Sequence, residues 1–147
     1  MKALVQRVAR AAVEIGGETV ASCGRGFLVL FGVAVGDAPE AADRLAERTV
    51  KLRIFEDESG KTNRSIEDVG GGIVVVSQFT LYADTDHGHR PGFSRAARPE
   101  TAVPAYERYV AALRRLLGDK RVGTGRFGAD MQVSLVNDGP FTVELTA

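Results

Sequence analysis

The spacing of apolar residues changes twice along this chain, and the order of those changes limits the fold more than any other feature. Apolar and polar residues alternate near both ends, with the period of two that strands have, whereas the middle contains stretches with the spacing of amphipathic helices. Strands grouped at the ends and helices between them are typical of α+β proteins. We therefore predict an α+β fold with two main helices on one side of a mostly antiparallel sheet.

Residues 1–35 predict a hairpin and a central strand. Alternation from Ala3 to Ile15 indicates one long, bent strand, and Gly16-Gly17 is a two-residue turn signal that leads into a second strand over Thr19–Ala21. Phe27–Val35 is apolar at consecutive positions, as strands buried on both faces are. We expect this third strand to lie inside the sheet.

Two stretches in the middle of the chain have helical spacing. Ala42–Val50, preceded by Pro39, indicates a first helix, and an apolar stripe over Val103–Leu117 indicates a second, with Pro104 in its opening turn. Ile73–Val76 predicts a further strand between the helices. Two segments without a clear period are expected to be exposed: Glu56–Asp68 and Asp84–Pro99.

The C-terminal tail alternates cleanly on both sides of a turn signal. Met131–Val136 and Phe141–Leu145 each have the period of a half-buried strand, and Asn137–Pro140 separates them. We therefore predict a strand, a tight turn and a returning strand.

Composition places the chain among ordinary globular proteins. Its 147 residues fit one domain, residues 1–147, which is large enough to bury a hydrophobic core. The 19 Lys and Arg residues balance 19 Asp and Glu residues, which argues against coating of nucleic acid through many phosphate contacts but leaves recognition of a short RNA end open. Cys23 is the only cysteine, and Met1–Arg10 lacks the apolar run of a signal peptide. These features favour a cytoplasmic protein without a membrane role.

Several common kinds of site are disfavoured by their surroundings. Gly123–Gly128 has the spacing GxGxxG, but a strand is predicted where a dinucleotide site needs a helix N-terminus. His87 and His89, with Asp86 nearby, fall short of the three protein ligands that a zinc site needs. The acidic run Glu56–Glu58 lacks the alternating ligands of a calcium loop. We expect neither a metal nor a cofactor.

Two motifs remain after these exclusions. Ser77–Leu81 places hydroxyl and amide groups at the end of an apolar strand, where polar side chains are costly unless they are paired or used. Asn137–Pro140 places a Gly-Pro peptide in the predicted tail turn. Taken alone, the first motif is also explained as an ordinary strand end and the second as an ordinary turn.

These motifs are similar to those of the bacterial D-aminoacyl-tRNA deacylase family, also called D-tyrosyl-tRNA(Tyr) deacylases. Ser77-Gln78-Phe79-Thr80-Leu81 corresponds to the family pattern SQxTL, and Asn137-Asp138-Gly139-Pro140-Phe141-Thr142 corresponds to NxGPxT. Further agreement runs over essentially the whole chain, at Val5–Val8, Leu52–Phe55, Tyr82–Asp84 and Phe127–Met131. Phe141 departs from the pattern, because a smaller aliphatic residue is common there.

The resemblance implies a fold, an assembly and an activity. The fold is a three-layer β/β/α arrangement, and the protein is a homodimer in which the Gly139-Pro140 pair of one subunit, joined by a cis peptide, reaches the active site of the other. The implied activity is hydrolysis of the ester of D-aminoacyl-tRNA and of mischarged glycyl-tRNA. The resemblance further implies that Phe127 and Met131 line a pocket for the terminal adenine, although both are also explained as core residues.

Chemical roles for the first motif follow from how little an aminoacyl ester requires. Backbone N–H groups of Phe79 and Thr80 are candidate oxyanion donors, while Ser77 and Gln78 are expected to bind substrate and shape the strand end. Thr80 as a covalent nucleophile is an alternative, but no base is visible near it in the sequence. The 2′-hydroxyl of the terminal adenosine is a further candidate for activating water.

The second motif suits selection between mirror-image substrates. A rigid wall of backbone carbonyls close to the α-carbon rejects the L-isomer by steric clash and desolvation, while glycine has no side chain to exclude. We expect Gly139, Pro140 and Asn137 to contribute to substrate binding in this way.

Two other interpretations stay open at this point. One is an RNA-end binder on the same scaffold that cleaves no ester, and the other is a structural dimer with no effect on tRNA. Arg90, Arg95 and Arg98 lie in one predicted loop, where they either meet phosphates of the acceptor end or remain solvated.

Overall fold

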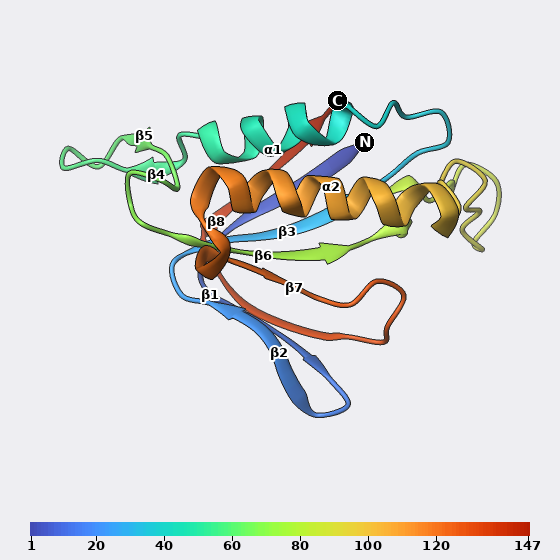
Figure 1. Ribbon diagram of the computed structural model, residues 1–147, viewed down its shortest axis with the longest axis horizontal. Helices are drawn as coiled ribbons and strands as arrows, with labels where there is room; N and C mark the ends of the chain where they lie inside the picture. The colour runs from blue at the N-terminus through green and yellow to red at the C-terminus, as the bar shows by residue number, and fades with distance from the viewer.

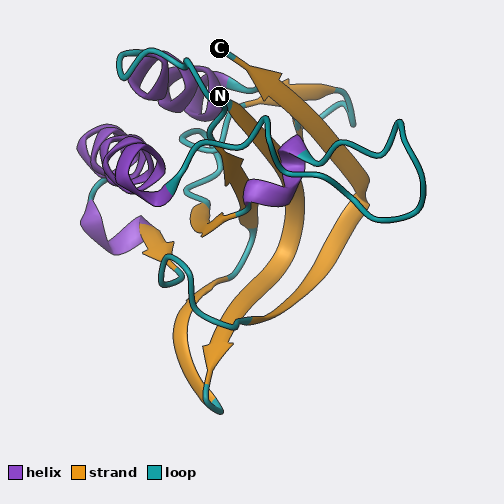
Figure 2. Cartoon of the chain, turned by 90° about the vertical axis from the view of Figure 1, so that its right-hand side faces the viewer, coloured by secondary structure: helices purple, strands orange, loops and turns teal.

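The computed structural model describes residues 1–147 and places two helices on one face of a strongly curved sheet (Figures 1 and 2). The helices are α1 (Ala41–Lys51) and α2 (Pro99–Leu117). The large sheet contains β1 (Lys2–Ile15), β2 (Glu18–Cys23), β3 (Gly26–Gly32), β6 (Gly72–Ser77), β7 (Val122–Thr124) and β8 (Gln132–Thr146). Smaller elements are β4 (Phe55–Glu56), β5 (Thr62–Arg64) and two 3₁₀ helices, Phe79–Tyr82 and Asp119–Arg121. The predicted α+β class with two main helices is confirmed.

Strand β1 organises the sheet because it is long enough to pair with three neighbours. It is antiparallel to β2, β3 and β8, with β3 along its first half, β2 along its second half and β8 along nearly all of it. The predicted long first strand and its hairpin at Gly16-Gly17 are therefore confirmed. In Figure 2 this hairpin extends away from the helices.

The remaining pairings of the large sheet are parallel. The sheet runs in the order β2-β1-β3-β6-β7, and β6 is parallel to both β3 and β7. Parallel neighbours need crossover connections, and α1 and α2 lie in the two connections that lead from β3 to β6 and from β6 to β7. The expectation of antiparallel pairing therefore holds around β1 and is wrong at β6 and β7.

The predicted hairpin in the C-terminal tail is wrong. Gln132–Thr146 forms one strand, β8, which runs straight through Asn137–Pro140. Both halves of β8 pair antiparallel with the same partner, β1, so the chain has no reason to reverse between them. The turn residues instead coincide with shifts in the β1–β8 register opposite Gln6–Arg10, as at a β-bulge.

Helix α2 begins five residues earlier than Pro104 suggested. Pro99 occupies the first helical turn, where a missing N–H costs nothing, and Pro104 lies inside the helix. Pro104 is exposed, so water can satisfy the carbonyl that its missing N–H leaves free. The placement of Pro104 in the opening turn was therefore wrong, although the helix itself was predicted.

The main hydrophobic core fills the space between the two helices and the sheet. Phe31 of β3 stacks on Tyr109 of α2 with ring centroids 4.4 Å apart. The Tyr109 hydroxyl is buried and lies 2.8 Å from the Thr49 hydroxyl of α1, which itself donates to the Leu45 carbonyl. Burial raises the pKa of Tyr109, so this hydroxyl pair stays neutral while it joins the helices.

The two chain ends lie side by side (Figure 1). The Met1 ammonium group is buried, donates to the Ala147 carbonyl at 2.7 Å and forms an ion pair with Asp37 at 2.6 Å. Asp37 also accepts the Ala34 N–H at 2.7 Å. These contacts fasten the loop that follows β3. Neither helix is long and apolar enough to cross a membrane.

Candidate active site

The motif Ser77–Leu81 spans the end of β6 and the start of a 3₁₀ helix. Ser77 is the last residue of β6, and the Gln78 N–H extends the pairing by donating to the Phe31 carbonyl at 2.7 Å. Phe79 and Thr80 then open the helix Phe79–Tyr82, where the first N–H groups have no acceptor inside the helix. Neither residue donates a backbone hydrogen bond elsewhere in the chain. Two adjacent backbone donors are therefore free at this strand end.

Thr80 lies beside this strand end but not in the cavity described next. It is exposed, and its hydroxyl accepts a hydrogen bond from the side-chain amide of Gln78. No histidine, lysine or carboxylate is hydrogen-bonded to it. The geometry thus supplies no base for Thr80 as a nucleophile.

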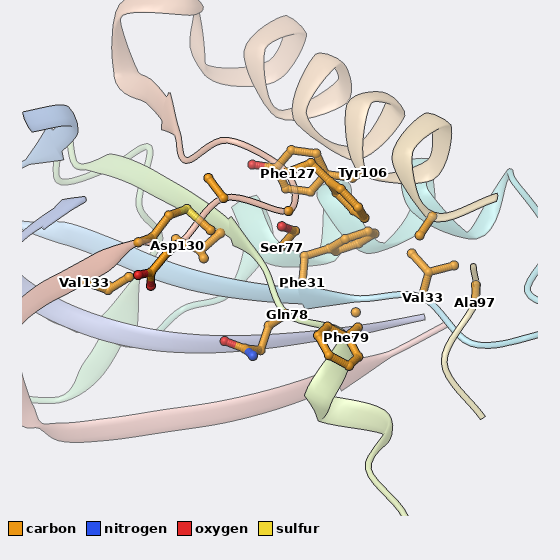
Figure 3. A pocket seen from close by; sticks show the side chains of 16 residues that line it. Phe31, Val33, Ser77, Gln78, Phe79, Ala97, Tyr106, Phe127, Asp130 and Val133 are labelled. Carbon is orange, nitrogen blue, oxygen red and sulfur yellow. The ribbon is translucent and has the colours of Figure 1, made fainter. Parts of the chain in front are cut away.

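A cavity of about 340 Å³ opens next to the free N–H groups (Figure 3). It lies between the ends of β3 and β6, the first turns of α2 and the segment that connects β7 to β8. Its walls include these residues from the sequence prediction: Ser77, Gln78, Phe79, Phe127 and Met131. Eleven of its sixteen lining residues are hydrophobic, so the cavity suits a flat, largely apolar group such as a nucleobase.

One wall of the cavity is aromatic. Phe127 meets Tyr106 of α2 edge to face, with ring centroids 6.1 Å apart, and both rings lie at the same side of the cavity in Figure 3. The Tyr106 hydroxyl donates to the Val75 carbonyl at 3.0 Å, and the Gly125 N–H donates to the same carbonyl. Burial raises the pKa of Tyr106 to about 12, so its hydroxyl stays protonated and keeps this bond at neutral pH.

The Gly139-Pro140 pair lies outside the cavity of its own chain. Its peptide bond is cis, and both residues are exposed. Gly139 has a φ of +129°, which side-chain-bearing residues rarely adopt, and a Cβ there would come within 3.0 Å of the Arg7 guanidinium. The Asn137 side chain accepts the Phe141 N–H at 3.2 Å and so bridges the segment. This chain therefore presents Gly139 and Pro140 outward.

Arg7 holds the Gly-Pro segment from inside the protein. The residue is only 6% exposed, and its Nε donates to the Asp138 carbonyl at 2.9 Å. Another guanidinium nitrogen donates to the Ile54 carbonyl at 2.5 Å, and the guanidinium lies 5.0 Å from the centre of the Phe141 ring. A buried cation is costly unless its donors are used, and here they fix the residues on both sides of Gly139-Pro140.

The sequence-predicted site residues thus form two groups. Ser77, Gln78, Phe79, Phe127 and Met131 line one cavity, with Thr80 just outside it, whereas Asn137, Gly139 and Pro140 form a separate, exposed group. Sequence reasoning missed Arg7 and Tyr106 as site residues. Arg7 had a signal, since a charge stands at a position where the first strand otherwise alternates; Tyr106 was indistinguishable from the core stripe of its helix.

The loop arginines differ from one another. Arg95 forms ion pairs with Asp84 at 3.3 Å and Asp86 at 3.6 Å, so its charge is already used. Arg90 and Arg98 form none. No group of three or more His, Cys, Asp or Glu side chains is placed to hold a metal ion.

Comparison with known proteins agrees with this site. The profile of the family described as D-Tyr-tRNA(Tyr) deacylase matches residues 4–146. The D-aminoacyl-tRNA deacylase of Symbiobacterium thermophilum is 56% identical over 97% of this chain and 93% of its own length. That of Roseiflexus sp. is 55% identical over 99% of this chain and 92% of its own length.

Solved structures share the fold. A protein titled c-Myc DNA Unwinding Element Binding Protein superposes with a TM-score of 0.94 at 41% identity, covering 100% of this chain and 99% of its own. A probable eukaryotic D-amino acid tRNA deacylase superposes with a TM-score of 0.84 at 18% identity, covering 98% and 97%. The second match shows the fold alone.

A curved α+β domain with an apolar cavity beside free backbone donors, joined to these matches, defines a hydrolase that acts on aminoacyl-tRNA. The chain belongs to the D-Tyr-tRNA(Tyr) deacylase family, and its activity is that of a D-aminoacyl-tRNA deacylase.

Proposed function

We propose that this enzyme removes D-amino acids and mischarged glycine from tRNA, spares L-aminoacyl-tRNA, and cleaves the ester at the strand end formed by Ser77–Thr80. The observation that carries the proposal is the pair of free N–H groups, Phe79 and Thr80, at the rim of an apolar cavity. Such donors stabilise the negative charge that develops on a carbonyl oxygen as an ester is attacked.

In this mechanism the protein orients the ester and water supplies the nucleophile. Water attacks the ester carbonyl carbon, the bond to the ribose oxygen breaks, and a proton passes to that oxygen, so the products are tRNA and the free amino acid. The vicinal ribose hydroxyl assists the proton transfer, because no side-chain base lies beside Thr80. Gln78 positions the substrate through its side-chain amide, and Ser77 shapes the cavity floor.

The terminal adenosine occupies the cavity. Phe127 and Met131 offer an aromatic ring and a thioether to the base, with Tyr106 behind Phe127. Replacing Phe127 by Ala removes one stacking face, which is worth about 1–3 kcal/mol per base in other proteins. We expect KM for D-aminoacyl-tRNA to rise at least fivefold while circular dichroism and the melting temperature change little. An unchanged KM with a large loss of stability would favour a core role for Phe127.

The filter against L-amino acids comes from Gly139 and Pro140 of a second protomer. Support comes from their position: in one chain they lie outside the cavity, exposed and held by Arg7. Backbone carbonyls there would crowd an L side chain at the α-carbon, whereas glycine passes. Asn137 stabilises the segment through its bond to Phe141.

A test with mixed protomers separates this arrangement from a site within one chain. One protomer carries Gln78→Ala and the other carries Gly139→Ala, and each homodimer is expected to lose D-selective turnover. A heterodimer regains one complete site only if the cavity and the Gly-Pro pair come from different chains. Sedimentation velocity of the wild type measures the dimer directly. Failure to recover D-selective turnover in verified heterodimers would refute the shared site.

The three-layer β/β/α arrangement is part of the same proposal. A second, smaller core cluster lies within the curve of the sheet, between β1, β2, β3 and β6, and is separate from the core under the helices. This second core supports counting the curved sheet as two β layers. The substrate places the enzyme in the cytoplasm, where translation takes place.

The net charge of zero supports tRNA ends, rather than duplex DNA, as the partner. A fluorescence titration with duplex DNA at physiological salt is expected to give no saturable binding.

The decisive experiment measures release of D-tyrosine, L-tyrosine and glycine from charged tRNA by the purified protein. Release of D-tyrosine and glycine at rates far above that of L-tyrosine supports the proposal. Saturable binding of the charged tRNA without release would favour an RNA-end binder that cleaves no ester.

A further inference from the structure

A second hollow adjoins the cavity on the other side of its aromatic wall. It has a volume of about 310 Å³ and lies between α2 and residues 124–127, which follow β7. Tyr106 and Phe127 line both spaces, so the two are separated only by these rings (Figure 3). We call this hollow the α2 groove; its remaining lining residues are Val103, Glu107, Val110, Ala111, Arg114, Thr124, Gly125 and Arg126.

The α2 groove carries two arginines whose charges are not used inside the protein. Arg114 and Arg126 are both exposed, and neither forms an ion pair or a side-chain hydrogen bond. Other arginines of the same helix behave differently: Arg108 pairs with Asp43 of α1 at 2.6 Å, and Arg115 contacts it at 3.9 Å. Unpaired guanidinium groups in a groove are suited to phosphate, which they bind in a fork.

The floor of the groove is apolar, formed by Val103, Val110 and Ala111, and one acid, Glu107, lines it. A chain with alternating apolar and anionic parts fits such a surface better than a uniformly acidic one. Sugar and base edges would lie on the floor and phosphates would lie on the arginines, as in grooves that follow single-stranded nucleic acid.

We propose that the α2 groove binds the single-stranded RNA immediately 5′ of the terminal adenosine of the substrate, with Arg114 and Arg126 contacting its phosphates. The inference rests on the proposed function, because it takes the adenosine to be in the cavity. A strand that leaves the cavity past Phe127 meets Arg126 first, since the two residues are adjacent in sequence, and then Arg114 on the helix. The two arginines thus lengthen the recognised RNA beyond one nucleotide without placing a broad basic face on the protein.

The test compares two substrates that differ only in the RNA upstream of the adenosine. D-tyrosyl-tRNA contains it, and D-tyrosine esterified to adenosine lacks it. In the Arg114→Ala and Arg126→Ala variants we expect KM for D-tyrosyl-tRNA to rise roughly tenfold each, as for loss of a charged hydrogen bond. For the adenosine ester, kcat/KM should stay within about twofold of wild type, because nothing in the cavity is altered.

Two further variants act as controls. Arg115→Ala removes the same charge from the next residue of the helix, outside the groove, and is expected to leave both substrates unaffected. Glu107→Gln removes the only acid of the groove and should lower KM for D-tyrosyl-tRNA by roughly twofold to threefold. In the double arginine variant the slope of log affinity against log salt should become shallower by about two, one for each lost phosphate contact.

Three outcomes are distinguishable. Selective loss on D-tyrosyl-tRNA in the groove variants supports the proposal. Equal effects of the groove variants on both substrates, or equal effects of Arg115→Ala and Arg114→Ala, would overturn it. If the wild type cleaves neither D-substrate, the proposed function itself has failed, and that result is seen before any variant is made.

Discussion

Replacing Arg7 by Met should destabilise the fold and weaken chiral selection together. Met keeps most of the apolar length of the side chain but removes the donors to the Ile54 and Asp138 carbonyls. A buried acceptor left without a partner costs about 1–3 kcal/mol. Ile54 is buried, so its carbonyl bears most of that cost, while water can reach half-buried Asp138. We expect a loss of about 2–4 kcal/mol, within the 5–15 kcal/mol stability typical of a domain.

The assay has two readouts on the same protein. Equilibrium unfolding in urea gives the change in free energy, and the ratio of D-tyrosine to L-tyrosine release gives the selectivity. Arg25→Met is the matched control, because Arg25 also lies over an aromatic ring, 5.1 Å from the Phe55 centroid, but is exposed. An exposed cation–π contact is worth about 0.5–1 kcal/mol, so this variant should lose no more than that and keep its selectivity.

Arg7→Lys tests whether charge alone is enough. Lys keeps the charge but has no planar fork to reach two carbonyls at once, so we expect an intermediate stability and a reduced D-to-L ratio. The reasoning is refuted if Arg7→Met loses no more stability than Arg25→Met and discriminates between D and L as well as the wild type.

Three further predictions concern other parts of the molecule. Thr80→Val should keep kcat within about tenfold of wild type, since it removes one exposed hydrogen bond; a loss of more than a thousandfold in single-turnover rates would instead establish a required hydroxyl. Tyr106 has a pKa raised to about 12 from an ordinary 10, so its contribution to stability is complete below pH 10 and is lost as the pH rises towards 12; urea unfolding of Tyr106→Phe should show a smaller fall over that interval than the wild type. Asp37→Asn removes the partner of the buried Met1 ammonium and should cost about 3 kcal/mol, against less than about 1 kcal/mol for Lys2→Ala, whose partner is exposed; calorimetric melting checks the difference.

Local patterns in the sequence were sufficient where an element depends on its own residues. The alternation of the first strand, the Gly16-Gly17 turn and the apolar stripes of both helices each specify an element without reference to the rest of the chain. The first motif was also found locally, because polar groups at the end of an apolar strand are unusual wherever they occur.

The sequence pattern failed where a distant partner decides the structure. Asn137–Pro140 has the composition of a turn, but β1 pairs with the residues on both sides of it, and that pairing keeps β8 continuous. β7 is only three residues long and exists because β6 lies beside it. Neither the pairing of β1 with β8 nor that of β6 with β7 leaves a trace in a single sequence.

The same missed pairings explain why the site forms where it does. Because β3, β6 and β7 are parallel, their carboxyl ends meet at one edge of the sheet. The chain leaves that edge at Val33 after β3, at Gln78 after β6 and through the segment containing Phe127 after β7, and all three residues line the cavity. In an antiparallel arrangement the end of β6 would lie beside the start of its neighbours, and the free N–H groups of Phe79 and Thr80 would have no apolar cavity beside them. Ligand sites at the carboxyl ends of parallel strands are a general consequence of this geometry. The SQxTL motif is therefore informative only in combination with the parallel part of the sheet, which its own residues do not encode.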